Sequence, residues 1–218
     1  MSKANVSVII PTYQREQVLT ETIGYLLRLE VSPSEILIVD QTGRHDPGTE
    51  RELARLEREG KIRWLRLAHP SVTHAMNVGL DGARNDIVLF LDDDIIPGAE
   101  LIAAHARAHA QEACNIIAGQ VLQPGEEPEA ATGAEFKFCS VSRRHISELM
   151  GGNFSIKRRV ALELGGFDEN FVHVAYRFEA EFASRALASR GRSARRQSSR
   201  ALFRRPRGQR TECSCPGS

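Results

Sequence analysis

The chain has 218 residues, of which 41% are hydrophobic and 26% are charged, and its net charge is +1. This length favours one α/β domain over two, and no apolar run approaches the roughly 18 residues of a membrane span. The N-terminus lacks the apolar segment of a signal peptide, so we expect a cytoplasmic protein.

Short runs rich in β-branched residues alternate with longer helical patterns. The patterns predict strands at 6–10, 35–40, 61–67, 86–91 and 115–119, and helices at 16–30, 49–59, 73–83 and 99–112. This alternation is typical of an α/β fold with a mostly parallel, Rossmann-like sheet and helices on both faces. Ligands of such sheets bind at the carboxyl ends of the strands, so the functional residues should follow these runs.

The first two strands end in polar residues without a glycine-rich loop. The first turn reads PTYQRE, which excludes the usual dinucleotide and P-loop signatures. The second strand ends at Asp40, which could either hydrogen-bond a nucleoside or cap a turn, because Asp-x-Thr-Gly also suits a turn. The residues alone leave both interpretations open.

The strand at 86–91 runs directly into three carboxylates, Asp92, Asp93 and Asp94. Like charges this close repel by an amount on the order of 1 kcal/mol even in water, unless a cation lies between them. One aspartate would be enough to cap the next helix. Carboxylates are the hard ligands that Mg2+ and Mn2+ prefer, and Mg2+ commonly takes further ligands from substrate phosphates. The block therefore predicts a metal-assisted reaction of a nucleotide diphosphate compound.

Four segments together resemble the successive blocks of the family 2 glycosyltransferases, in their order and at their usual separations. They begin VSVIIPTYQRE at Val6, EILIVDQT at Glu35, NVGLDGARND at Asn77 and GGNFSIKRR at Gly151. The resemblance covers about residues 5–185. It implies a GT-A fold, a nucleotide-sugar donor, a divalent metal ion and usually inversion at the anomeric carbon.

The resemblance also implies roles for individual residues. Asp93 would lie near the ribose, and the Gly-Gly-Asn segment would border the donor sugar and the acceptor. The residues expected to bind the nucleotide sugar are Pro11, Thr12, Tyr13, Asp40, Gln41, Asn77, Asp92, Asp93, Gly152 and Asn153. The residues expected to hold Mn2+ or Mg2+ are Asp94 and Asp92.

Two positions depart from the family pattern. Gln41 stands where relatives often have a second aspartate that would read a uracil edge, so the identity of the base stays open; an amide can still pair with a base. Met76 stands where many relatives have an arginine before the asparagine, which removes one phosphate cation. His74 and Arg84 are the candidates to replace it, although both also suit a solvated helix surface.

Inverting transfer needs a general base for the acceptor hydroxyl. The family places an acidic pair, usually Glu-Asp, on a helix after the Gly-Gly-Phe-Asp-Glu block, and here that position reads Phe178-Glu179. Glu179 is therefore the expected base, with Glu181, about 200° further around the helix, as the alternative. Both could instead be surface acids. Asp168 and Glu169 are expected to be turn and cap residues.

Charge divides the chain into two regions. From Arg185 onward there are ten arginines and one acid, whereas the residues before it include 19 basic and 27 acidic side chains. We expect a GT-A domain at 1–189, with a nucleotide-sugar half to about 122 and an acceptor half from 123, and a disordered basic tail at 190–218. The tail could bind nucleic acid or an anionic membrane, or it could be an abnormal terminus produced by truncation or a frameshift. The family resemblance does not extend into it.

The sequence predicts a metal-dependent glycosyltransferase with a nucleotide-sugar donor and a carbohydrate or lipid-linked acceptor. We expect it in the cytoplasm or at the inner face of the membrane, with no specific nucleic-acid partner. A catalytically incomplete, nucleotide-binding relative of the same fold is the main alternative. A metal-dependent phosphohydrolase is less consistent with the sequence, because the first strand is followed by PTYQ rather than by a nucleophilic aspartate.

Overall fold

The computed structural model describes residues 2–111, 114–129, 138–141, 145–146, 149–171, 177–188 and 194–203. Of these, residues 145–146 and 194–203 are described by their backbone only. The first half contains β1 (Ser2–Thr12), α1 (Gln17–Leu27), β2 (Val31–Asp40), α2 (Pro47–Arg58), β3 (Arg63–Arg66), α3 (Val72–Gly82) and β4 (Ile87–Leu91). The second half contains β5 (Ile95–Pro97), α4 (Leu101–Gln111), β6 (Ile116–Leu122), β7 (His145–Ile146), β8 (Asn153–Lys157), α5 (Arg158–Glu163), α6 (Phe178–Ala188) and β9 (Ala194–Phe203).

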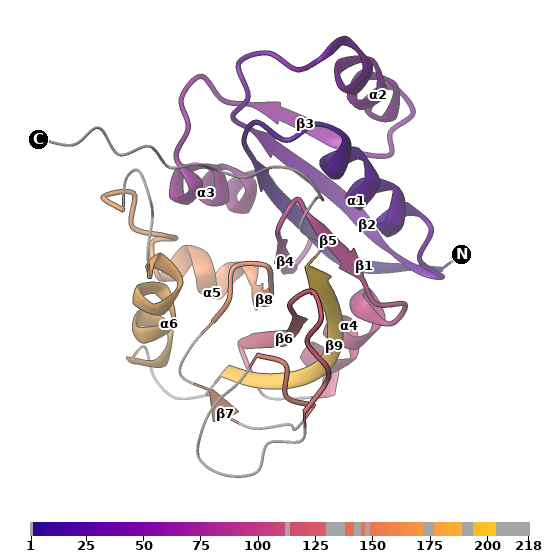
Figure 1. Ribbon diagram of the computed structural model, residues 1–218. Helices are drawn as coiled ribbons and strands as arrows, with labels where there is room; N and C mark the ends of the chain where they lie inside the picture. The colour runs from indigo at the N-terminus through magenta and orange to yellow at the C-terminus, as the bar shows by residue number, and fades with distance from the viewer. Residues whose placement is uncertain are drawn as a thin grey trace, which may run out of the picture.

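One sheet runs through the molecule in the order β3-β2-β1-β4-β8-β6-β9-β5, with β7 paired to β9 (Figure 1). The pairs β3–β2, β2–β1 and β1–β4 are parallel. Strand β8 then runs antiparallel to both β4 and β6. The carboxyl ends of β1, β2 and β4 therefore lie at one edge, with the start of β8 beside them.

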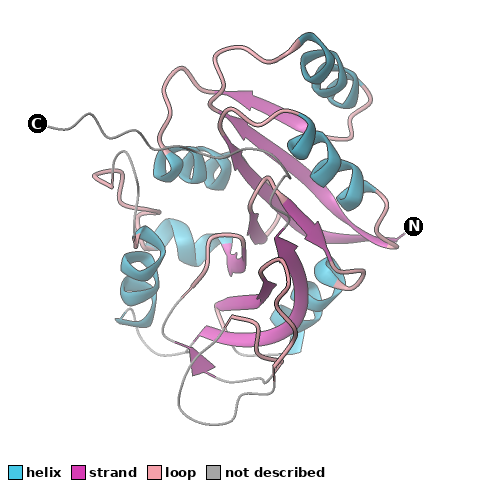
Figure 2. Ribbon diagram, in the orientation of Figure 1, coloured by secondary structure: helices cyan, strands magenta, loops and turns pink. Residues whose placement is uncertain are grey.

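Helices cover both faces of the sheet (Figure 2). Side chains alternate along β1, so that Val8 and Ile10 pack with Leu19, Leu53 and Leu101 of α1, α2 and α4. The core on the opposite face combines Ile9 of β1 with residues of α3, α5 and α6, including Met76, Leu80, Val160 and Phe182. Burial of these apolar faces is the main favourable term in the stability of such a three-layer arrangement.

Local signals fix the starts of two helices near the strand ends. The Asp46 carboxylate accepts hydrogen bonds from the backbone N–H groups of Gly48 and Thr49, with Pro47 as the first residue of α2. Ser71 caps α3 by accepting a hydrogen bond from the His74 backbone N–H. Both caps satisfy N–H groups that the first helical turn leaves without partners.

The α/β class, the parallel half of the sheet and every strand and helix that the sequence predicts are confirmed, with bounds shifted by a few residues. The expected disorder beyond residue 190 differs from the structure over Ala194–Phe203, which forms β9. This strand pairs by its backbone with β6 and β5. Edge strands offer unpaired N–H and C=O groups to any extended segment, so a strand can be added there without an apolar sequence pattern. Residues 190–193 and 204–218 lie outside the described residues.

Candidate active site

The three aspartates emerge where β4 ends between two neighbouring strands. Phe90 of β4 is in register with Ile9 of β1, and Leu91 is in register with Asn153 of β8. The chain after Leu91 therefore lies between the carboxyl end of β1 and the Gly151-Gly152 turn that leads into β8. Segments about 80 and 60 residues away in sequence thus meet at Asp92–Asp94, as sheets of this type require.

Asp93 and Asp94 have partners from the end of β1 and the loop after it. The Thr12 hydroxyl donates a hydrogen bond of 2.6 Å to Asp93 Oδ2, and both groups are buried. The Arg15 guanidinium forms ion pairs with Asp93, at 3.3 Å from Nε, and with Asp94, at 3.7 Å from Nη2. One arginine thus stands against two of the three carboxylates.

The carboxylates at this site are poorly stabilised in their charged forms. Burial, together with the charges of Asp94, Asp93 and Glu179, raises the pKa of Asp92 to about 7. Burial raises the pKa of Asp93 to about 6, although the Thr12 hydrogen bond and Arg15 act in the opposite direction. The pKa of Asp94 is also raised by burial, again against the effect of Arg15. A cation bound beside the three carboxylates would stabilise their charged forms.

Helix α6 brings Glu179 to the same place. Phe178 and Phe182 lie one helical turn apart and pack on Phe167, whose ring centroid is 4.3 Å from that of Phe182. With α6 fixed in this way, the Glu179 carboxylate accepts a hydrogen bond from the Gly151 backbone N–H. A Cβ atom at Gly151 would lie 2.9 Å from Glu179 Oε1, so a larger residue there would require this carboxylate to shift. Burial raises the pKa of Glu179.

Glu181 has a different environment. Arg185 holds it by two hydrogen bonds, from Nε at 2.5 Å and from Nη2 at 2.7 Å. The same guanidinium donates to the carbonyl oxygens of Leu164 and Gly166. Glu181 therefore ties α6 to the preceding turn, and of the two predicted bases only Glu179 acts electrostatically on Asp92.

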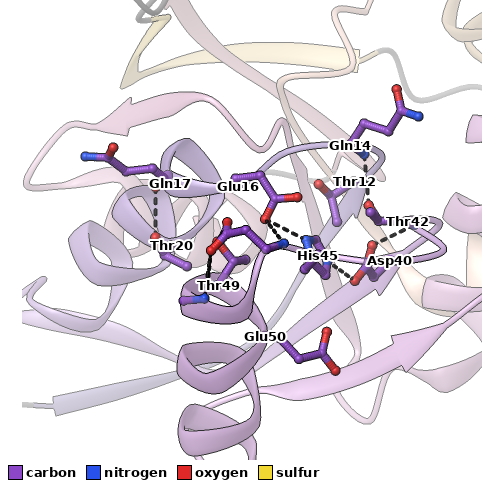
Figure 3. Close-up of polar contacts among 12 residues, drawn as sticks. Thr12, Gln14, Glu16, Gln17, Thr20, Asp40, Thr42, His45, Thr49 and Glu50 are labelled. Atoms are coloured by element: carbon purple, nitrogen blue, oxygen red, sulfur yellow. Dashed lines mark hydrogen bonds and ion pairs between the residues drawn. The ribbon is translucent and has the colours of Figure 1, made fainter.

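A buried network lies at the carboxyl end of β2. His45 lies between Glu16 and Asp40, with its ring nitrogens 3.0 and 2.7 Å from their carboxylate oxygens (Figure 3). Asp40 also accepts hydrogen bonds from Trp64 Nε1 and from the Thr42 backbone N–H. Burial alone lowers the pKa of His45, but its contacts with Asp40 and Glu16 outweigh burial and raise it. Asp40 is thus satisfied within the protein, and its contact with a nucleoside stays a prediction.

Three further predicted residues lie at the ends of β1 and β2. Thr12 and Gln41 are buried, whereas Tyr13 is 45% exposed and Pro11 is partly buried. The Gln41 amide accepts a hydrogen bond from the Ser71 N–H and donates one to the Thr12 carbonyl. These bonds join β1, β2 and the start of α3, and the exposed Tyr13 ring remains accessible from solvent.

Asn77 and Asn153 have structural partners. Asn77 binds both the N–H and the C=O of Phe167 and also reaches Glu169, which contacts His74. Asn153 is buried, where it contacts His105 Nε2 at 2.9 Å and donates to the Gln120 carbonyl. Gly152, immediately before it, is also buried. The expected turn roles of Asp168 and Glu169 agree with these contacts and with the Asp168–Asn170 hydrogen bond.

Arg84 lies away from the strand carboxyl ends. Its backbone N–H and its side chain both contact Glu35, near the middle of β2. It lines a pocket of about 460 Å³ together with Glu35, Lys61 and Arg63. Arg84 is therefore badly placed for the phosphate role that the sequence allows. A pocket of about 290 Å³ lies nearer the site, beside Thr42, His45, Trp64 and Arg66.

The donor atoms at Asp92–Asp94 suit a hard divalent cation. Within the described part of the chain, no three His, Cys, Asp or Glu side chains already form a metal-binding cluster. Mg2+ commonly takes one or two carboxylates from a protein and its other ligands from substrate phosphates and water. The raised pKa values and the arginine opposite two of the carboxylates show that the site favours positive charge.

Arg15 and His45 were not predicted from the sequence as parts of the site. Both lie in loops directly after the strand ends, at QRE and RHDP, so the rule that ligands bind at strand carboxyl ends could have drawn attention to them. Their carboxylate partners are up to 79 positions away in sequence, and only the packed fold brings them together.

The model of the family described as "Glycosyl transferase family 2" matches residues 7–180. The chain belongs to this family. The match includes the end of β1, the aspartate block, the Gly151-Gly152 turn and Glu179. No described helix has both the length and the apolar character needed to cross a bilayer.

Two curated relatives and two solved structures illustrate the similarity. The uncharacterized glycosyltransferase YfnE of Bacillus subtilis is 29% identical over 114 residues, covering 52% of this chain and 29% of its own length. The glucosyl-dolichyl phosphate glucuronosyltransferase of Haloferax volcanii is 25% identical over 182 residues, covering 76% of this chain and 56% of its own length.

GalNAc-T7 with UDP, GalNAc and Mn2+ superposes with a TM-score of 0.73 at 14% identity, covering 91% of this chain and 43% of that one. The mannosyltransferase PcManGT from Pyrobaculum calidifontis, in complex with GDP-Man and Mn2+, superposes with a TM-score of 0.68 at 18% identity, covering 94% of this chain and 58% of that one. These likenesses confirm the GT-A fold. The chain spans less than two thirds of the length of each of these relatives.

Proposed function

We propose that this chain transfers a sugar from a nucleotide-diphosphate donor to an acceptor hydroxyl, with the help of Mn2+ or Mg2+. The observation that carries the proposal is the convergence of Asp92–Asp94 with Glu179 across the Gly151 turn. The Mn2+ and nucleotides bound by the two structural neighbours support it. The acceptor is a carbohydrate or a lipid-linked sugar, as the relative that acts on glucosyl-dolichyl phosphate suggests.

Asp94 and Asp92 would hold the metal ion, which when bound would neutralise the diphosphate leaving group. Asp93, fixed by Thr12, would face the ribose. Tyr13 is exposed enough to stack on the base. The remaining nucleoside contacts fall to Pro11, Asp40 and Gln41, and the donor sugar would lie along Gly152. Asn77 supports the site by bracing the turn at Phe167, and Asn153 supports it by bonding the Gln120 carbonyl of β6.

Glu179 would take the proton of the acceptor hydroxyl as its oxygen attacks the anomeric carbon. A new carbon–oxygen bond forms on one side, the bond to the diphosphate breaks on the other, and the configuration inverts. The raised pKa of Glu179 brings this carboxylate closer to the operating pH, where a general base is most effective. Its hydrogen bond from Gly151 holds it in place.

The test is turnover of a panel of nucleotide sugars with and without Mn2+, in wild type, Glu179→Gln and Glu181→Gln. We expect Glu179→Gln to bind the donor normally and to lose about 10² to 10⁴-fold in transfer, the usual effect of removing a general base. Glu181→Gln should lose far less, because Arg185 already occupies that carboxylate. Donor binding without transfer to any acceptor would instead identify a non-catalytic relative, and equal small losses would reject Glu179 as the base.

A further inference from the structure

The loop between β1 and α1 is shaped so that Arg15 faces the aspartates. Gln14, just before it, has a φ of 53°, the left-handed region that residues other than glycine rarely adopt. The Gln14 N–H is tied to the Thr42 hydroxyl at 2.8 Å, and Glu16, just after it, contacts His45 and the Asp46 N–H. The loop is thus anchored to the loop after β2 on both sides of Arg15, through the backbone of Gln14 and the side chain of Glu16.

The Arg15 side chain is held much less firmly than its backbone. Its contacts of 3.3 and 3.7 Å with Asp93 and Asp94 are longer than those of a well-formed Arg–carboxylate fork. The side chain is 37% exposed, whereas those of Asp93 and Asp94 are 11% and 19% exposed. A loosely held, solvent-accessible cation therefore faces two enclosed carboxylates, and it can leave them if another cation arrives.

We propose that Arg15 is an exchangeable counter-ion: it neutralises Asp93 and Asp94 in the free protein, yields Asp94 to the divalent ion, and then binds the donor's diphosphate. This proposal rests on the proposed function, because it assumes a metal ion at Asp94 and a diphosphate beside it. A guanidinium group binds phosphate oxygens in the same forked geometry in which it binds carboxylate oxygens. The exchange would make metal binding weak until the nucleotide supplies Arg15 with a new anionic partner.

The proposal makes Arg15→Gln act in opposite directions on two affinities. Mn2+ alone should bind about tenfold more tightly than to wild type, because a competing positive charge is gone from the carboxylates. A nucleoside diphosphate in saturating Mn2+ should bind about tenfold more weakly, because a charge-assisted phosphate contact is lost. A residue with only a structural role would weaken both.

The experiment measures free Mn2+ by electron paramagnetic resonance and the binding of UDP and GDP by calorimetry, using the full chain. Arg28→Gln, at an exposed site beside Tyr25, removes the same charge and should change neither affinity. Arg15→Lys keeps the charge but not the forked geometry of the guanidinium, so it should keep the wild-type Mn2+ affinity and lose nucleotide affinity. This variant also tests the proposal if Arg15→Gln does not fold.

Unchanged or weaker Mn2+ binding in Arg15→Gln would overturn the exchange, as would tighter Mn2+ binding in Arg15→Lys. Absence of Mn2+ binding in both wild type and Arg15→Gln would also overturn the exchange. If wild type bound neither UDP nor GDP in the presence of Mn2+, the proposed function would fail with it. Normal nucleotide binding in wild type combined with a null effect of Arg15→Gln would reject only the role of Arg15.

Discussion

Two groups of acids at the same edge of the sheet differ in how the protein treats them. Asp40, after β2, accepts hydrogen bonds from Thr42 and Trp64 and contacts His45, so its charge is compensated inside the fold. Asp92, after β4, has its pKa raised to about 7 by burial and by three neighbouring acids. The first group stabilises the scaffold, and the second is left short of positive charge where a ligand would bring it. Functional sites often carry such perturbed groups.

The sharpest way to break this comparison is to remove Asp40. Asp40→Ala should lower the free energy of unfolding by about 3 kcal/mol or more, because it leaves the buried rings of Trp64 and His45 and the half-buried Thr42 N–H without an acceptor. Urea denaturation measures the change. Asp81→Ala, at an exposed position of α3, is the matched control and should stay within about 0.5 kcal/mol of wild type. Equal effects of the two substitutions would refute a scaffold role for Asp40.

Asp92→Asn should change the free energy of unfolding in the opposite direction, toward higher stability. The native carboxyl keeps its proton up to about pH 7, whereas the unfolded chain releases it near 3.8, so this group destabilises the metal-free protein increasingly as pH rises through that range. At pH 8 the amide should raise stability by about 1 kcal/mol, or roughly 3 °C in the melting temperature. Thermal melts in a chelator measure it, and a clear loss of stability would contradict the comparison.

The smallest expected effect concerns His45. Its raised pKa means that its protonated form stabilises the fold fully below its unfolded value of 6.5, and that this contribution disappears as pH rises through the native pKa. His45→Gln should therefore remove part of the decline in stability above pH 6.5. Free energies of unfolding from pH 6 to 9, compared between wild type and the variant, test the slope rather than the absolute stability. Parallel curves would show that His45 is not charged in the native state.

The sequence predicted the fold well because strong signals are local. The alternation of apolar runs predicts β1 to β4 and α1 to α4, and the charge of Asp92–Asp94 marks the candidate site at the end of β4. The role of Asn77 could not be predicted, because an asparagine in an amphipathic helix does not reveal that Phe167, 90 positions away, is its partner. β9 was not predicted because its sequence is mostly polar before Ala201, and its position depends on backbone pairing with β6 and β5.

The two predicted bases illustrate the same limit. Helical spacing places Glu179 and Glu181 on different faces, but it does not say which face meets the aspartates. The orientation of α6 is set by Phe178 and Phe182, which pack one side of the helix against Phe167. Arg185 binds the Glu181 carboxylate, which holds that side chain away from the candidate site. The glycine at 151 was predicted as a ligand border, whereas its proximity to Glu179 depends on the packing of α6.

The most direct test of the central claim is calorimetric titration of UDP and GDP into wild type and Asp94→Asn, each with Mn2+ and with a chelator. We predict that wild type binds at least one of them tightly only when Mn2+ is present. Asp94→Asn should lose this dependence, because an amide is a much weaker ligand for a hard cation. Metal-dependent binding of wild-type strength in Asp94→Asn would contradict the assignment of the aspartates as the metal site.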